Sequence, residues 1–492
     1  MPSAAAAFHR RIDDALADTR VRAALASTMT RLTNGRAGAL ASLEASDAIR
    51  DQARRIRAHT IAHLDTYLDQ FARNADARGC RIHWAPTATD ATRIIVEIAR
   101  AEDISLAVKS KSMVTEEIEL NAALGAAGIR VVETDLGEFV VQVGADRPSH
   151  IIAPIVHKRR EDVARLFQDK LGARPEEVAD VAAITAFARR LLRRDFLQAG
   201  MGISGVNLAV ADSGSFCLVT NEGNGRLSTT LPRVHVAVMG LERIVPNAAD
   251  LGIVLQLLAR SATGQALSVY TNIISGPRRP ANPGAPGAHG APGAPGAGEP
   301  DGPDQLHVVI VDNGRTRMLD GPLAEMLYCI RCGACLNICP VYRHIGGHAY
   351  GGVYPGPMGA VVSPGLMGLD QWSELPHASS LCGACKDVCP VRIDLPHLLL
   401  TLRAQAADRE LGPWWLRLAM PIYAAVATRP ALYQWLGSLA ARVSQGLARG
   451  GWIRRLPGPL AAWTAARDFP APARRSFLQT YEQRRGRTGN AS

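Results

Sequence analysis

Seven of the nine cysteines lie in two short runs, and the first run leaves few ways to fold the chain around it. It reads C-x₂-C-x₂-C-x₃-C followed by a proline, and its members are Cys329, Cys332, Cys335, Cys339 and Pro340. Three thiolates this close together can hold one face of an iron–sulfur cube, while the fourth ligates the other cluster in two-cluster ferredoxins. The spacing therefore predicts iron–sulfur binding.

A second cysteine run follows and also ends in a proline. Its members are Cys382, Cys385, Cys389 and Pro390. In each run a glycine, Gly333 or Gly383, stands where the backbone must turn tightly around inorganic sulfide. The matching proline-closed ends favour two clusters whose runs exchange one ligand.

Exchange of the last cysteine gives two ligand sets of unequal size. The first set is Cys329, Cys332, Cys335 and Cys389, and the second is Cys339, Cys382 and Cys385. We therefore expect [4Fe-4S] for the first cluster and [4Fe-4S] or [3Fe-4S] for the second. The cysteine that would complete the second run is replaced by Ser379. The sequence leaves open whether that corner is vacant or is capped by Ser379, His377, water or a partner's group.

Two other uses of cysteine fit the sequence less well. Structural zinc takes four ligands per site and does not require three cysteines within seven residues. Chain length and the absence of a secretory signal argue against a disulfide framework. Cys80 and Cys217 lie in apolar segments and are predicted to be inert core thiols. This usage suits a reducing cytosol, so we predict a cytoplasmic location.

The net charge of +10 belongs to the C-terminal tail. Residues 401–492 contain 14 arginines, no lysine, four acidic residues and five of the seven tryptophans. A charge confined to the tail argues against a general nucleic-acid-binding surface. Arginine and tryptophan on amphipathic helices favour peripheral contact with the inner face of the membrane or with an acidic partner. Packing of the tail on the cluster region is an equal alternative. The apolar run at 418–427 is too short to cross a bilayer.

The part before the cysteines alternates between strand and helix patterns. Residues 4–80 are expected to be helical; then RIHWA, LAVKSKS and IRVVETD alternate with helices through ATRIIVEIARAE and EEIELNAALGAAG. IIAPIV, VNLAVAD, FCLVTN and HVAVMG continue the strand series, with helices near 160–168 and 178–198. This order predicts an α/β fold with a mostly parallel sheet covered on both faces.

Three places near strand ends could line a pocket, although turn and cap chemistry would also explain them. They are residues 109–112 leading to Thr115, residues 212–215 with 221–225, and residues 263–265. Thr115 is expected to cap a helix whose N-terminus, beside Lys109 and Lys111, could hold an anion. His344, His348 and His377 near the cysteines are expected to form hydrogen bonds in loops. Catalytic residues are not identifiable.

A Gly/Pro/Ala-rich segment at 276–305 interrupts the α/β pattern and is expected to be an insertion loop. The composition then divides the chain into four parts. These are a helical region at 1–80, an α/β domain at 81–320, an α-helical two-cluster ferredoxin domain at 321–400 and a basic helical tail at 401–492.

The chain resembles the lactate-utilisation protein B family, which supplies the iron–sulfur subunit of a three-protein L-lactate oxidation system. The matching stretches are VKSKSMVTEEIELN, DLGEFVVQ, SHIIAP, ADSGSF, CIRCGACLNICPVYRHIGGHAYGGVYPGP and SLCGACKDVCPVRIDLP. The resemblance covers nearly the whole chain and departs mainly at the insertion, residues 281–299. It implies an α/β lactate-utilisation domain similar in fold to the ribose-phosphate isomerase and CoA-transferase families.

The resemblance also implies a function: a non-catalytic electron-transfer subunit in the oxidation of L-lactate to pyruvate. Its partners would be the other subunits of the system, and it would pass electrons to a membrane or soluble acceptor. Two alternatives stay open. The subunit could serve another 2-hydroxy acid such as glycolate, or the α/β domain could be a ligand-binding or catalytic module with structural clusters.

Overall fold

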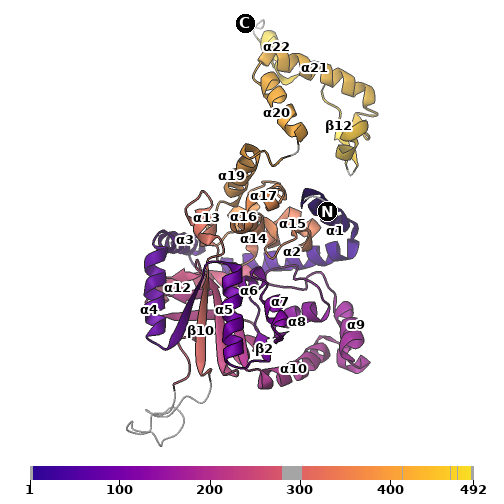
Figure 1. Cartoon of the computed structure of the whole chain (residues 1–492). Helices are drawn as coiled ribbons and strands as arrows, with labels where there is room; N and C mark the ends of the chain where they lie inside the picture. The colour runs from indigo at the N-terminus through magenta and orange to yellow at the C-terminus, as the bar shows by residue number, and fades with distance from the viewer. Residues whose placement is uncertain (1–3, 280–301, 413, 466, 474, 489–492) are drawn as a thin grey trace, which may run out of the picture. The chain divides into compact units, whose positions relative to one another are not determined.

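The computed structural model describes residues 4–279, 302–412, 414–465, 467–473 and 475–488 (Figure 1). It divides into two compact units, Met1–Arg409 and Glu410–Ser492. Most of the Gly/Pro/Ala-rich segment lies outside the described residues, but its two ends meet, with Arg278 N donating to Pro303 O at 2.9 Å. The predicted boundaries at 80, 320 and 400 stay predictions.

Four helices begin the chain, and the last of them shows why this region is helical. They are α1 Ala4–Ala17, α2 Thr19–Ala41, α3 Ser46–Ala62 and α4 Leu64–Asp76. In α4 the buried residues Leu64, Leu68, Phe71 and Ala75 recur at helical spacing. Helices α2 and α3 both pack against α12, Ala248–Ala262.

A six-stranded sheet forms the centre of the first unit, with the strand order β1-β10-β7-β4-β2-β3. Its strands are β1 Cys80–Ala85, β2 Leu106–Lys109, β3 Arg130–Glu133, β4 Met201–Gly205, β7 Val234–Gly240 and β10 Gln305–Val311. All neighbouring strands are parallel. The predicted parallel sheet is therefore confirmed, and its carboxyl-end edge is the expected place for a site.

Helices cover both faces of this sheet, as predicted, because side chains alternate along each strand. In β2, Ala107 packs with α5, Ala88–Ala101, and α7, Leu120–Ala126. Its neighbours Leu106 and Val108 pack on the opposite face. The helices on that second face are α8 Leu136–Val143, α9 Arg160–Leu171 and α10 Val181–Gln198.

A second sheet, with the order β8-β5-β6-β9, was not predicted. Its strands are β5 Leu208–Val210, β6 Ser215–Thr220, β8 Ile244–Val245 and β9 Tyr270–Ile274. Strand β6 pairs antiparallel with both β5 and β9, whereas β5 and β8 are parallel. The sequence pattern placed VNLAVAD and FCLVTN in one series with the parallel strands because strand periodicity does not say which sheet a strand joins.

Three local predictions were wrong. Residues 151–156 form turns rather than a strand, and Ser149 N donates to Pro154 O across them at 2.8 Å. The helix expected over 116–128 is broken into α6 Met113–Glu117 and α7 by Glu119, whose φ is 54°. Ser112, not Thr115, caps α6, since its hydroxyl accepts the Thr115 amide at 3.4 Å.

Short helices build the cysteine-containing region around one buried helix, α16. They are α13 Arg315–Leu319, η2 Ala324–Tyr328, α14 Ala334–Ile338, α15 Pro340–Ile345, η3 His348–Tyr350, α16 Gly356–Met367, α17 Leu369–Trp372, η4 Leu375–His377, α18 Ala384–Asp387 and α19 Leu395–Asp408. Small residues let α16 approach its neighbours, because a Cβ at Gly365 would lie 2.7 Å from the sulfur atom of Met318 on α13.

The second unit is helical with one small hairpin. It contains α20 Trp414–Ala427, α21 Pro430–Leu447, β11 Trp452–Ile453, η5 Gly458–Thr464, β12 Phe469–Pro470 and α22 Phe477–Thr488. Large apolar side chains such as Trp435 and Ile422 are exposed within it. Among the described residues, no helix combines the length and apolar character that a membrane crossing requires.

Candidate iron–sulfur site and adjoining pocket

Four cysteines from the two runs line one small cavity. They are Cys329, Cys332, Cys335 and Cys389, the set expected from ligand exchange. Apolar side chains, including Ile330 and Val391, complete the walls. An apolar cavity lined by four cysteines suits a thiolate-ligated iron–sulfur cluster, so the residues present fit the group.

The other three cysteines form a second group beside the first. Burial and then Cys382 raise the pKa of Cys339, and burial and then Cys339 and Cys382 raise the pKa of Cys385, so the three thiols lie close together. Cys385 also lies close enough to Cys335 to affect its ionisation. Cys382 is exposed, whereas Cys339 and Cys385 are buried. The second group therefore reaches the surface at Cys382, whereas the first group has only partly exposed members, Cys329 and Cys335.

Backbone amides point at several of these sulfur atoms. Arg331 N donates to Cys329 Sγ at 3.4 Å, and Ile393 N donates to Cys389 Sγ at 3.3 Å. Such contacts stabilise the thiolate and tune cluster potential. Burial nevertheless raises the pKa of Cys332 to about 12. This thiol therefore needs a cation close by to ionise near neutral pH.

Arginines on two N-terminal helices hold the second run. Arg36 on α2 donates to Val388 O at 2.6 Å, and Arg50 on α3 donates to Cys389 O at 2.9 Å. Arg50 is buried. These guanidinium groups satisfy carbonyl oxygens of the loop around Cys389 and place positive charge beside the first cavity.

Arg57 likewise donates hydrogen bonds to carbonyl oxygens, here in the segment before Cys329. Its guanidinium donates to Leu327 O at 3.0 Å and to Glu242 O at 2.6 Å. The side chain is wholly buried, and this burial lowers the pKa of Arg57 to about 10.

No role is assigned to these arginines in the sequence analysis. A signal was present: Arg50, Arg54 and Arg57 stand at i, i+4 and i+7, the spacing of a buried helical stripe. Arg54 follows the same pattern and pairs with Glu325 at 2.6 Å.

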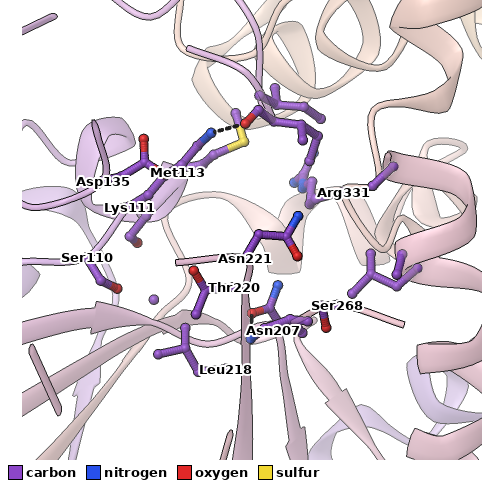
Figure 2. Close-up of a pocket in the computed structure, with 18 of the residues that line it drawn as sticks. Ser110, Lys111, Met113, Asp135, Asn207, Leu218, Thr220, Asn221, Ser268 and Arg331 are labelled. Carbon is purple, nitrogen blue, oxygen red and sulfur yellow. Dashed lines mark hydrogen bonds between the residues drawn. The ribbon is translucent and has the colours of Figure 1, made fainter. Parts of the chain in front are cut away.

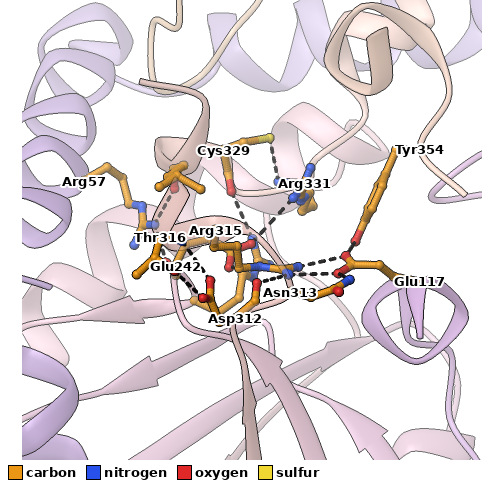
Figure 3. A network of polar contacts seen from close by, with 12 residues as sticks. Arg57, Glu117, Glu242, Asp312, Asn313, Arg315, Thr316, Cys329, Arg331 and Tyr354 are labelled. Carbon is orange, nitrogen blue, oxygen red and sulfur yellow. Dashed lines mark hydrogen bonds and ion pairs between the residues drawn. The ribbon is translucent and has the colours of Figure 1, made fainter. Parts of the chain in front are cut away.

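A buried ion network joins the α/β sheet to the first cysteine run (Figure 3). Arg315 pairs with Glu117 at 2.8 Å and with Glu242 at 2.6 Å, and Tyr354 donates to Glu117. Arg331 lies 3.5 Å from Glu242 and stacks on Tyr354. Burial alone would raise the pKa of Glu242, but Arg315 and Arg331 lower it to about 2. The carboxylate is therefore charged at physiological pH.

A pocket of about 660 Å³ lies at the carboxyl ends of the parallel strands (Figure 2). Ser110 after β2, Gly205 at the end of β4 and Gly240 at the end of β7 belong to its walls. Ile151 and Arg331 line both this pocket and the cavity of the first cysteine group. The two spaces are therefore neighbours that share part of one wall.

Charged side chains of both signs face the pocket. Lys111 lines it and donates to Ile152 O at 2.8 Å, and Arg331 lies on the wall towards the cysteines. Asp135 and Glu222 also belong to the lining. Burial, and then the charge of Asp135, raise the pKa of Glu222 to about 7. Glu222 can therefore gain or lose a proton near neutral pH.

Some of the residues predicted at the strand ends line the pocket, and others are buried outside it. Ser110, Lys111, Asn221 and Thr263 line the pocket, but Lys109 does not. Lys109 is buried behind it and pairs with Glu133 at 2.7 Å.

The residues at 212–215 lie outside the pocket lining: the first three form a turn, and Ser215 begins β6. A Cβ at Gly214 would come within 2.3 Å of Ala75 N, so the turn packs tightly on α4.

Two further acidic residues, Glu116 and Glu138, lie close to the Lys109–Glu133 pair. Burial, followed by Glu116, raises the pKa of Glu138 to about 8. Burial also raises the pKa of Glu116. Burial opposes the charge on Lys109, but Glu133 and its neighbours keep the pKa of that lysine raised. Glu138 is therefore largely protonated near neutral pH.

The histidines near the cysteines contact the backbone. His344 Nδ1 lies 2.7 Å from Pro340 O, and His348 Nε2 lies 2.7 Å from Arg147 O. His377 is at the end of η4. Cys80 and Cys217 are buried free thiols, and burial raises their pKa to about 11 and about 12.

Family models match three successive parts of the chain. A LUD domain covers residues 68–311, a 4Fe-4S dicluster domain covers residues 325–393, and "Lactate utilisation protein B, C-terminal" covers residues 409–486. The second match identifies an iron–sulfur domain that contains all seven cysteines of the two runs.

Relatives are similar over nearly their full length. "Lactate utilization protein B" of Bacillus pumilus is 44% identical over 486 residues, which is 98% of each chain. The proteins with that name from Bacillus licheniformis and Geobacillus kaustophilus are each 43% identical, covering 98% and 99% of this chain and 98% of their own. With three matching domains in the same order and identity at this level, the chain belongs to the lactate utilization protein B family.

Proposed function

We propose that the chain is the iron–sulfur electron-transfer subunit of a system that oxidises L-lactate to pyruvate. It takes electrons from a partner's active site and passes them to a membrane or soluble acceptor. The observation that carries the proposal is the four-cysteine cavity beside the strand-end pocket. The relatives' name, lactate utilization protein B, supplies the substrate.

The proposed ligand sets follow the two cysteine groups. Cys329, Cys332, Cys335 and Cys389 hold the first cluster, and Cys339, Cys382 and Cys385 hold the second. Iron–sulfur clusters exchange single electrons, so two of them match the two electrons released when a 2-hydroxy acid becomes a 2-keto acid. The exposure of Cys382 favours the second group as the surface point of exchange with a partner.

Rapid-mixing absorbance tests the proposal directly. The reconstituted chain, mixed anaerobically with its partner subunits and L-lactate, should lose cluster absorbance on the time scale of turnover. The chain alone with lactate should show no bleaching and no dye reduction. Robust lactate oxidation by the isolated chain would contradict the non-catalytic role. Loss of cluster absorbance with glycolate but not with lactate would show that glycolate is the substrate.

The pocket favours a second candidate role, in which the α/β domain binds a small carboxylate. Lys111 and Arg331 supply positive charge on its wall, and Glu222 can hold a proton there. Calorimetric titration with lactate and pyruvate tests this role. Lys111→Met should weaken any binding at least tenfold, while Lys170→Met on the exposed end of α9 should not. Unchanged binding in Lys111→Met would remove the pocket from this role.

A further inference from the structure

The two cysteine runs are related by a constant offset of 50 residues. Cys332, Cys335 and Cys339 correspond to Cys382, Cys385 and Cys389, and the prolines and glycines correspond likewise. At this offset Cys329 corresponds to Ser379. Ser379 is therefore either a ligand, like Cys329, or an ordinary loop residue, and the local geometry at the two positions distinguishes these roles.

The backbone makes the same turn in both runs. Arg331 and Leu381 stand one residue before the second cysteine position, and their φ angles are 58° and 53°. Non-glycine residues rarely adopt this left-handed conformation, and a bulky leucine does so only where the surroundings impose it. Gly333 and Gly383 follow with φ angles of 78° and 84°. The second run therefore keeps a ligand-binding turn although its first cysteine is absent.

The γ atoms at the two corresponding positions accept a hydrogen bond from equivalent backbone amides. Cys329 Sγ accepts the amide two residues ahead, from Arg331, at 3.4 Å. Ser379 Oγ accepts the amide two residues ahead, from Leu381, at 3.1 Å. A serine hydroxyl often makes such a turn by itself. Here the contact also reproduces the contact of an iron-binding cysteine.

An arginine holds the carbonyl oxygen of each residue. Arg243 Nη1 donates to Cys329 O at 3.0 Å, and Arg403 Nη2 donates to Ser379 O at 3.1 Å. The two arginines come from unrelated elements, the loop before β8 and helix α19. Both main-chain positions are therefore fixed from outside the run.

We propose that Ser379 is the fourth protein ligand of the second cluster and binds one iron through Oγ as an alkoxide. This inference rests on the two ligand sets proposed above. Formation of the Fe–O bond releases the hydroxyl proton and changes no oxidation state. Solvent can take this proton because the neighbouring Cys382 is exposed. With Cys339 and Cys385, the set then completes a [4Fe-4S] cluster.

The other protein candidate, His377, does not share this geometry. It corresponds at the same offset to Leu327, a buried core residue, and its ring is exposed. Its backbone amide donates to Glu374 O at 3.0 Å, within η4.

Mössbauer and EPR spectra of the full chain, reconstituted anaerobically with ⁵⁷Fe, test the proposal. Wild type should hold about eight irons, one of them with an oxygen ligand, and should give no three-iron signal. Ser379→Ala should hold about seven irons and give a three-iron signal on oxidation. Ser379→Cys should keep about eight irons, lose the oxygen-ligand signature and raise the midpoint potential of the second cluster, because thiolate is softer than alkoxide.

The control variant His377→Ala should keep the iron content and the oxygen-ligand signature. Wild type with about seven irons and a three-iron signal would overturn the proposal, as would spectra of Ser379→Ala identical to those of wild type. If Ser379→Ala does not fold, the comparison of wild type with Ser379→Cys still decides. Fewer than about five irons in wild type would instead refute the two-cluster proposal itself.

Discussion

At the scale of single residues, Glu138 is the clearest case of a side chain whose charge depends on its surroundings. Burial raises its pKa from the ordinary value of 4.5 to about 8. Between these two values the folded chain binds a proton that the unfolded chain has released. The free energy of unfolding should therefore fall as the pH rises from about 5 to about 8.

Glu138→Gln should remove this fall. The variant should unfold at a higher temperature than wild type at pH 8 and show a smaller difference at pH 5, by differential scanning fluorimetry. Glu44→Gln, at an exposed position, should follow wild type at both pH values. Parallel pH profiles for wild type and Glu138→Gln would show that this carboxyl group does not titrate abnormally.

At the scale of elements, helix α3 acts as a clamp on the loop that carries Cys389. Arg50→Met would leave the carbonyl oxygens of Asp387 and Cys389 without this donor, and the buried bond to Cys389 O alone is worth about 1–3 kcal/mol when its acceptor is left unsatisfied. The variant should lose iron to a chelator several-fold faster than wild type, as followed by absorbance of the ferrous complex. Arg55→Met, on the exposed side of α3, is the matched control and should match wild type. Equal rates for all three proteins would assign Arg50 to packing alone.

Elements whose signal is local could be predicted from sequence, and those that depend on distant partners could not. The cysteine spacing and the alternation of strands and helices from β1 to β3 are patterns of residues close together in the sequence. They could therefore be predicted without knowledge of the fold. Residues 151–156 are as apolar as a strand, yet the surroundings make them a turn, where a Cβ added at Gly333 would lie 3.3 Å from Ile151. The acceptors of Arg50 lie more than 330 residues away, and no local pattern could indicate them.

At the scale of the whole molecule, most of the net charge and most tryptophans belong to the second unit, where large apolar side chains are exposed. We expect this unit to contact an anionic surface. A chain ending at residue 409 should bind vesicles rich in anionic lipid more weakly than the full chain at low salt, by sedimentation. Each basic residue contributes at most about 1 kcal/mol. Because this attraction is electrostatic and salt screens it, the binding of the full chain should weaken as salt rises. Equal binding would assign the tail to protein contacts, which a pull-down with the partner subunits would then measure.

Ligand exchange between the runs also fixes an order of events during synthesis. The first proposed ligand set contains Cys329 but is incomplete until Cys389 has left the ribosome, and Arg36 and Arg50 wait equally long for their carbonyl partners. The α/β part, made earlier, can fold while these residues are still absent. Delivery of iron must therefore follow synthesis of at least the first 389 residues, and the cysteines that are already made stay open to oxidation until then. A cell that makes this protein faster than it assembles clusters would accumulate the form most sensitive to oxygen.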